Sequence, residues 1–291
     1  VGQDYQTDCL LHGLRSVWGA DVVDAPYVWY MYKSSFGPGR HDRSKIYGKG
    51  FTIFGTLPDI TVDRDNIEDK IRSDFFDYII SIPYVDNPHW NLIQNHVPPE
   101  KMIWIDGHDL TRVKWRDTPL KGHHFKRELL SRDIGCHPIS FAFPQEKISE
   151  PLPKKSALSR LIPGDPSTYI YSTEHEYYNH YNQALFALTY KKMGWDCMRH
   201  YEILASRCVP WFVDLHNCPE TICTTLPKQQ LLEINKLIET HGVGQFMESD
   251  ARYLYPELNR KVFDHFLENC TTRSLALQVV TTAQESLPTI V

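Results

Sequence analysis

The chain has 291 residues, of which 42% are hydrophobic and 23% are charged, a composition that excludes an extensively disordered protein. Its net charge of −5, with acidic and basic residues interspersed, excludes a general nucleic-acid-binding protein. No apolar run reaches membrane-spanning length and no signal peptide opens the chain, so we expect a soluble protein without a transmembrane segment. The seven cysteines are scattered and form no CxxC pair, which favours reduced thiols and a cytoplasmic location, in the host cytoplasm if the source is a virus.

Short β-type runs alternate with helical patterns in the first half of the chain, and this alternation is typical of an α/β sheet. Val1 and Gly2 are interpreted as the end of a strand that begins further upstream. The expected helices are 7–17, 66–76 and 89–96, and the expected strands are 21–23, 51–55, 78–82, 102–105 and 139–143.

A proline-rich stretch, 144–155, is expected to be a linker, and the alternation restarts beyond it. The expected strands are 168–171, 185–189 and 209–213, and the expected helices are 174–183, 197–207, 228–240 and 257–284, with no strand after the last. This order predicts two Rossmann-like domains that face each other over a cleft, 1–148 and 149–255, and C-terminal helices, 256–291, that pack back on the first domain. Ligands in such sheets bind beyond the carboxyl ends of the strands.

The loop and helix after the strand 185–189 have the features of an anion site. Lys191, Lys192 and Gly194 form a basic loop, Asp196 can cap the helix that follows, and free N–H groups at a helix N-terminus favour a diphosphate. Arg199 and Glu202 lie opposite the helix face expected to pack on the sheet. Glu202 could accept hydrogen bonds from a ribose, or the two residues could be an ordinary solvated pair.

The run GWDCMRHYEILASRCVPWF resembles the donor-site segment of exostosin-like glycosyltransferases (glycosyltransferase family 47) and, more loosely, of other enzymes with the GT-B fold. The resemblance covers roughly 168–226 and departs from the family at Arg207, where a glycine is common. It implies a GT-B architecture, with the acceptor on the first domain and the nucleotide-sugar donor on the second. The roles it implies are ribose binding by Glu202, diphosphate binding by Arg199 with Lys191 or Lys192, and contact with the base or sugar by Trp195 or Tyr190.

The reaction that the resemblance implies is transfer of a sugar from a nucleotide-diphosphate donor, expected to be a UDP-sugar, to a hydroxyl of an oligosaccharide or glycoprotein. We expect an inverting, metal-independent enzyme that needs no cofactor besides the nucleotide sugar as co-substrate. Such an enzyme requires a general base. Two loops offer one: Asp4 lies in the first, and Asp106 and His108 lie in the second, directly after the strand 102–105. Asp106 could equally be a turn residue that binds its own backbone, because Gly107 follows it.

Two other functions remain open. Asp63-Arg64-Asp65 matches the DxD motif of metal-dependent GT-A transferases, although capping of the following helix also explains it. A nucleotide-sugar-binding or glycan-binding module without catalytic activity is the other alternative. His175 and His180 are five residues apart, about 140° around a helix, and therefore cannot share a metal ion as in HExxH.

Overall fold

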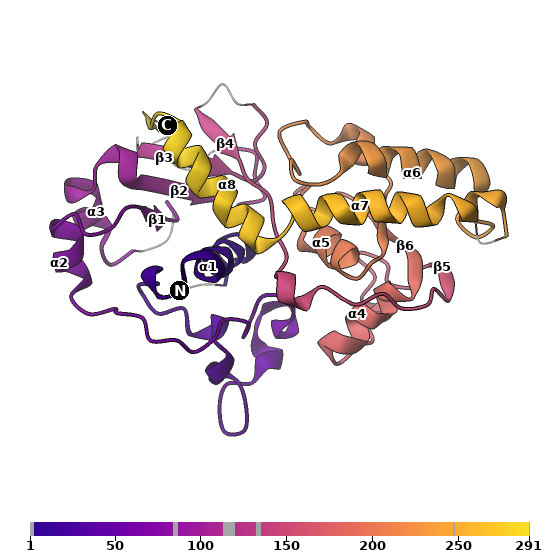
Figure 1. Ribbon diagram of the computed structural model, residues 1–291, viewed down its shortest axis with the longest axis horizontal. Coiled ribbons are helices and arrows are strands. Elements are labelled where there is room, and N and C mark those ends of the chain that lie inside the picture. The colour runs from indigo at the N-terminus through magenta and orange to yellow at the C-terminus, as the bar shows by residue number, and fades with distance from the viewer. Residues whose placement is uncertain (1–2, 84–86, 113–119, 132–134, 247, 291) are drawn as a thin grey trace.

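The computed structural model describes residues 3–83, 87–112, 120–131, 135–246 and 248–290. Two separate sheets with mainly parallel strands, flanked by helices, make the chain an α/β protein, as the alternating pattern predicts. The first sheet and its helices lie on the left of Figure 1, and the second lies on the right. Among the described residues, no helix has the length and apolarity needed to cross a membrane.

The first sheet is built from residues of the first half of the chain and from its last residues. Strands β1 (Ile79–Ser81), β2 (Met102–Asp106), β3 (Lys121–Lys126) and β4 (Cys136–Pro138) run parallel in chain order, and β8 (Thr289–Ile290) pairs antiparallel with β3. The helices of this part are α1 (Tyr5–Trp18), α2 (Ile67–Arg72) and α3 (Trp90–His96). Every residue of β2 is buried, which explains its unbroken apolar run MIWI.

The second sheet contains three parallel strands, β5 (Ser156–Leu158), β6 (Ala184–Thr189) and β7 (Val209–Phe212). Helix α4 (Glu174–Asn182) begins with a capping box between Thr173 and Glu176, and the chain then forms β6. Helix α5 (Met198–Ala205) connects β6 to β7, and α6 (Lys228–His241) follows β7. The carboxyl end of β6 therefore leads into the segment with the predicted donor residues.

The last two helices join the two halves of the molecule. Helix α7 (Tyr255–Asn269) packs on α5 and α6, whereas α8 (Thr272–Glu285) crosses to the first half and packs along α1, as Figure 1 shows. The contact with α1 is close at Gly13, where an added Cβ would lie 1.8 Å from the carbonyl oxygen of Thr272. A residue without a side chain is therefore required at this crossing.

Four expected strands are absent from the described sheets. The stretch 21–23 begins with the last residue of a 3₁₀ helix, and 168–171 begins with the last residue of another. The stretch 51–55 is a turn, and 139–143 forms only one isolated bridge, through Phe143. In 51–55 the side chains of Ile53 and Phe54 are buried in an irregular loop, in which Thr52 and Gly55 have φ angles of 66° and 65°. A short apolar run indicates burial but does not separate a strand from a buried turn. The expected strand end at Val1 and Gly2 lies outside the described residues.

Other strands were not expected from the pattern. Strand β3 has the sequence KGHHFK, in which the polar residues His123, His124 and Lys126 are all buried. The sequence therefore lacks the alternation or the continuous run of apolar residues by which a strand is recognised. Lys126 is tolerated because its ammonium group pairs with Asp106 at 3.1 Å. The strands β4, β5 and β8 are only two or three residues long; β5 follows the expected linker, and β8 comes after 257–284, where no further strand was expected.

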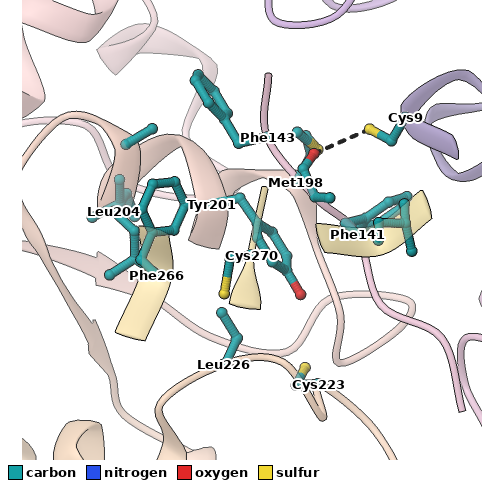
Figure 2. Packing of buried hydrophobic residues seen from close by; sticks show 14 of the residues in the cluster. Cys9, Phe141, Phe143, Met198, Tyr201, Leu204, Cys223, Leu226, Phe266 and Cys270 are labelled. Atoms are coloured by element: carbon teal, nitrogen blue, oxygen red, sulfur yellow. Dashed lines mark hydrogen bonds between the residues drawn. The ribbon is translucent and has the colours of Figure 1, made fainter. Parts of the chain in front are cut away.

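One buried cluster is continuous across both halves of the chain, that is, residues before and after position 148. It includes Cys9 of α1, Phe141 and Phe143 of the connecting segment, and side chains of α5 and α7. Figure 2 shows these groups packed together, with the Cys9 thiol donating to the carbonyl oxygen of Ala142 at 3.1 Å. Packing between the halves is therefore part of the main core, whereas the limits 1–148 and 149–255 remain predictions.

Candidate functional site

A pocket of about 320 Å³ has walls from both halves of the chain. Its lining is rich in tyrosine, and two ionisable side chains of α5, Arg199 and Glu202, face into it. The first half contributes Tyr5, Tyr47, Gly48, Lys49 and Phe51, and the second half contributes Tyr169, Tyr171, Tyr177, Cys197, Met198, Arg199 and Glu202. Aromatic side chains together with a cation and a carboxylate suit a ligand that has both a ring system and a negative charge.

The guanidinium group of Arg199 is the most incompletely bonded group of this pocket. It lies over the ring of Tyr169, 5.5 Å from the ring centroid. Its Nε and Nη1 atoms are buried and have no hydrogen-bond partner among the described residues. Because buried polar atoms almost always have a partner in native proteins, these two nitrogens indicate an anionic ligand.

Glu202 lies one helical turn after Arg199 and is buried, with 8% of its surface exposed. Its Oε1 atom accepts a hydrogen bond from Thr52 Oγ1 at 2.5 Å, and its Oε2 atom accepts one from Tyr177 OH at 2.9 Å. Burial raises the pKa of this carboxyl group. The interpretation of Arg199 and Glu202 as a solvated surface pair is therefore wrong.

The basic loop predicted for the diphosphate lies outside this pocket lining. Lys191 and Lys192 are exposed, and the Lys191 ammonium group lies 5.6 Å from the ring centroid of Trp195. The hydroxyl group of Tyr190 donates to the carbonyl oxygen of Pro163. The structure thus brings Arg199 and Glu202 together in the pocket, and Tyr190, Lys191, Lys192 and Trp195 lie outside its lining. Lys192 is still near enough to Arg199 that burial and the guanidinium charge both lower the pKa of its ammonium group.

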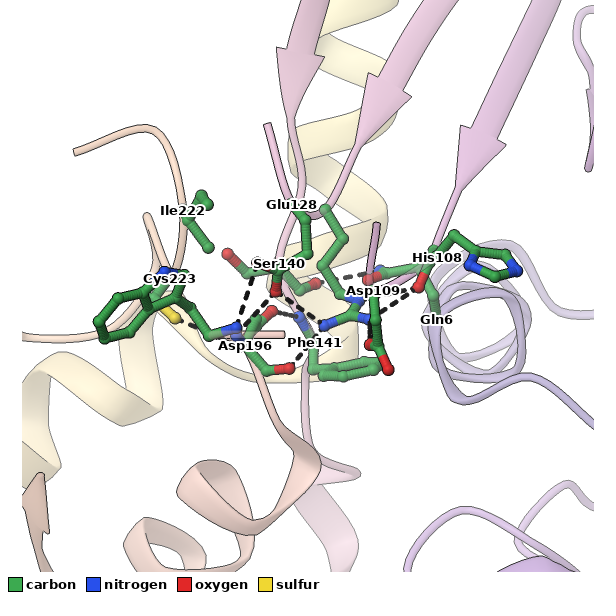
Figure 3. A network of polar contacts seen from close by, with 12 residues as sticks. Gln6, His108, Asp109, Glu128, Ser140, Phe141, Asp196, Ile222 and Cys223 are labelled. Carbon is green, nitrogen blue, oxygen red and sulfur yellow. Dashed lines mark hydrogen bonds and ion pairs between the residues drawn. The ribbon is translucent and has the colours of Figure 1, made fainter. Parts of the chain in front are cut away.

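Asp196 belongs to a network of polar contacts that connects the two halves, shown in Figure 3, and Gly194 lies against it. The carboxylate of Glu128 accepts hydrogen bonds from the backbone N–H groups of Trp195 at 3.1 Å and Asp196 at 2.9 Å. Arg127 donates to the backbone oxygen of Asp196 at 2.5 Å and also to that of Gly107. A Cβ on Gly194 would lie 2.5 Å from Glu128 Oε1, so the loop approaches the first half closely here.

The side chain of Asp196 completes this network. It accepts hydrogen bonds from the backbone N–H of Phe141 at 2.8 Å and from Tyr201 OH at 3.0 Å. Burial, partly offset by Arg127, raises the pKa of Asp196 to about 6. The prediction that Asp196 caps the next helix is wrong, because Cys197 occupies the N-cap position of α5 without a side-chain cap.

The two loops that were predicted to supply a general base lie next to each other. Asp4 caps α1 through a hydrogen bond from the Gln6 backbone N–H at 2.9 Å, and a Cβ on Gly107 would lie 3.2 Å from Asp4 Oδ1. Asp4 is partly exposed, and burial raises the pKa of its carboxyl group while the charge of Arg127 opposes this. The neighbouring Tyr5 lines the pocket, whereas the Asp4 carboxylate lies against Gln6 and Gly107 and is not part of the lining.

Asp106 and His108 differ in their access to solvent. Asp106 is fully buried, pairs with Lys126, and accepts a hydrogen bond from the His108 backbone N–H at 2.9 Å. This geometry is that of a turn carboxylate and disfavours Asp106 as a base for an incoming acceptor. The His108 side chain is partly exposed, and in Figure 3 its ring points away from the network.

Sequence reasoning did not single out Asp109, Arg127 or Glu128. Asp109 is exposed, pairs with Arg127, and would lie 3.2 Å from a Cβ on Gly194. These residues were missed because they come from separate parts of the chain and match no spacing rule. Only the unusual sequence KREL at the end of β3, with three charged residues in succession, could have drawn attention to Arg127 and Glu128.

Two other sets of residues are weaker candidates for a binding site. Asp63 and Asp65 are exposed, and the Asp63 carboxylate pairs with Lys70 at 2.8 Å. In the described parts of the chain, no three His, Cys, Asp or Glu side chains gather as metal ligands. A wider and more open hollow of about 490 Å³ contains Arg64, but this guanidinium already binds Asp24 at 2.5 Å. The tyrosine-lined pocket therefore remains the better candidate.

Comparison with known proteins gave no match to this chain among protein-family models, curated proteins or solved structures. The fold and the site define an α/β protein with two mainly parallel sheets and a tyrosine-lined pocket between the halves of the chain. Any function must therefore be argued from the chemistry of the pocket.

Proposed function

We propose that the protein is a glycosyltransferase of the GT-B type that transfers a sugar from a nucleotide-diphosphate donor, a UDP-sugar, to a glycan hydroxyl. The observation that carries the proposal is the partly unpartnered guanidinium group of Arg199 in a tyrosine-lined pocket. A phosphate oxygen would provide the acceptor that Nε and Nη1 lack, and an aromatic wall would contact the nucleoside.

The position of Glu202 supports the same ligand. Each of its carboxylate oxygens already accepts one hydrogen bond and can accept more, so a ribose hydroxyl could bind there without displacing Thr52 or Tyr177. Arg199 and Glu202 come from one short helix, which would bind the phosphate and ribose groups as one rigid unit.

The general base in this proposal is Asp4, which would accept the proton of the acceptor hydroxyl as that hydroxyl attacks the anomeric carbon. Burial raises the pKa of Asp4 above its usual value, and its partial exposure lets an acceptor hydroxyl approach it, whereas Asp106 is fully buried. The leaving diphosphate would be stabilised by the positive charge of Arg199. This assignment predicts that Asp4→Asn retains donor binding but loses transfer activity.

The first test is a thermal-shift screen with UDP-, GDP- and CMP-linked sugars. A ligand at about 100 times its Kd stabilises the folded state by about 2.7 kcal/mol, which should raise the Tm by about 5 °C or more. Arg199→Gln should abolish this shift, and Glu202→Gln, which preserves the shape of the side chain, should reduce it. Arg260→Gln is the matched control, because Arg260 is exposed on α7 and pairs only with Asp264 among the described residues. No shift with any donor would refute the proposal.

A binding module without catalysis is the second candidate, and two observations favour it: Asp4 already caps α1, and Asp106 is buried. Donor binding without transfer or hydrolysis, over a panel of acceptors, would support this module. A GT-A enzyme that uses Asp63 and Asp65 would instead lose all activity in EDTA and in the variants Asp63→Ala and Asp65→Ala.

A further inference from the structure

The segment 47–52, which forms one wall of the pocket, has an unusual backbone. Gly48, Lys49 and Gly50 are three consecutive residues with positive φ angles, of 59°, 59° and 70°, and Thr52 follows with 66°. Left-handed residues normally occur singly, and a β-branched residue in this conformation is strained. Such strain persists only where the surroundings enforce it, and it is frequent at ligand-binding sites.

Contacts from both halves enforce this conformation. The backbone N–H of Tyr47 donates to Gln3 Oε1 at 2.8 Å, and the backbone N–H of Thr52 donates to Glu174 Oε1 at 2.5 Å. The Thr52 hydroxyl group binds Glu202, so the wall is attached to the helix that also bears Arg199. The segment is therefore held at the pocket by hydrogen bonds at both of its ends.

One result of this geometry is the position of Lys49 at the mouth of the pocket. Its side chain is exposed, and its ammonium group donates to the backbone oxygen of Tyr171, a residue of the opposite wall, at 2.9 Å. An ammonium group has three donors, and this is its one hydrogen bond within the described residues. Among the described residues, the pocket lining thus contains two cations, Lys49 and Arg199, and one carboxylate, Glu202, that two hydroxyl groups already bind.

We infer that Lys49 is a second phosphate-binding residue of this pocket, so that the first half binds the diphosphate of the ligand together with Arg199 of α5. The inference assigns to Lys49 the role that the sequence assigned to Lys191 or Lys192. The inference rests on the proposed function in taking the ligand to carry a nucleoside. Binding of the diphosphate by Lys49 and Arg199 does not depend on that nucleoside.

The test measures binding of UDP, inorganic pyrophosphate and uridine to the whole chain by calorimetry. Lys49→Gln should weaken UDP and pyrophosphate about tenfold, because one charge-assisted hydrogen bond is lost, and should leave uridine binding unchanged. Lys49→Arg should restore most of the affinity. Lys45→Gln is the matched control, because Lys45 is an exposed lysine of the preceding 3₁₀ helix outside the pocket lining.

Wild-type affinity of Lys49→Gln for both UDP and pyrophosphate would overturn the inference and leave the proposed function standing. Pyrophosphate binding that depends on Lys49 and Arg199, without added affinity from any nucleoside, would support the anion site and refute the nucleotide-sugar donor. Failure of the unsubstituted protein to bind either UDP or pyrophosphate would overturn the inference directly. A loss of uridine binding in Lys49→Gln would also contradict it, since it would show a distorted pocket rather than a missing charge.

Discussion

The buried carboxyl group of Asp196 should make the protein less stable as the pH rises from 4 to 7. Its pKa is about 6 in the folded state, against 3.8 for an unperturbed aspartate, and burial is the main cause. The folded state therefore binds this proton more tightly than the unfolded state does. Its contribution to stability is fully present below about pH 4 and is lost as the pH rises through about 6.

The expected magnitude follows from the pKa difference. A shift of about two units corresponds to about 3 kcal/mol. Asp196→Asn removes the titration while an amide can still accept from the Phe141 backbone N–H and donate to Tyr201 OH. The free energy of unfolding of Asp196→Asn, relative to the unsubstituted protein, should therefore increase by about 3 kcal/mol between pH 4 and pH 7.

Urea denaturation of both proteins at several pH values measures this difference. Asp42→Asn serves as a control of opposite sign. The hydroxyl and backbone N–H groups of Ser44 lower the pKa of Asp42, so its contribution to stability is present at neutral pH and is lost as the pH falls. An Asp196→Asn difference that is constant with pH, or that decreases from pH 4 to pH 7, would refute the reasoning.

Two further predictions concern packing and thiol chemistry. Gly13→Ala should destabilise the fold by about 3 kcal/mol, because its Cβ would overlap the backbone of Thr272; urea denaturation measures this, and a loss below about 0.5 kcal/mol would contradict the close contact. Cys218 should be alkylated by iodoacetamide first, because it is partly exposed and a hydrogen bond with Cys223 lowers its pKa; peptide mass spectrometry identifies the modified residue, and faster labelling of a fully buried cysteine would contradict the packing. The buried cysteines whose pKa is raised are Cys9, Cys136, Cys208, Cys223 and Cys270.

The elements that the sequence predicts well are those in which the spacing of apolar residues along the chain shows which side chains are buried. The α5 stripe with Tyr201 and Leu204 and the apolar run of β6 are recognisable from period and length alone, and both are present. In contrast, β3 is stabilised by the Lys126–Asp106 pair and by bonds of two histidines, which no local pattern encodes. The turn at Thr52 was read as a strand for the opposite reason, because its neighbours are apolar but pack in an irregular loop.

The same distinction holds for the candidate site. Arg199 and Glu202 were predicted because one helix bears both, three residues apart, in a run that resembles a donor segment. The opposite wall could not be predicted, since Lys49 reaches the pocket only through a strained turn and a contact between distant parts of the chain. The local sequence predicts a helix cap at Asp196, because an aspartate before a helix usually caps it. Its true partner, the Phe141 backbone N–H, lies 55 positions away in the chain and cannot be found from local sequence.

The packing of α8 on α1 has a consequence for synthesis of the protein in the cell. Thr272 is translated 254 residues after Trp18, the last residue of α1. At a translation rate of about 5 to 20 residues per second, α8 is synthesised on the order of 10 to 50 s after α1. The apolar face of α1 has no partner helix during this time. During synthesis the apolar face of α1 is therefore exposed until α8 has left the ribosome, and a chaperone could bind it in that interval.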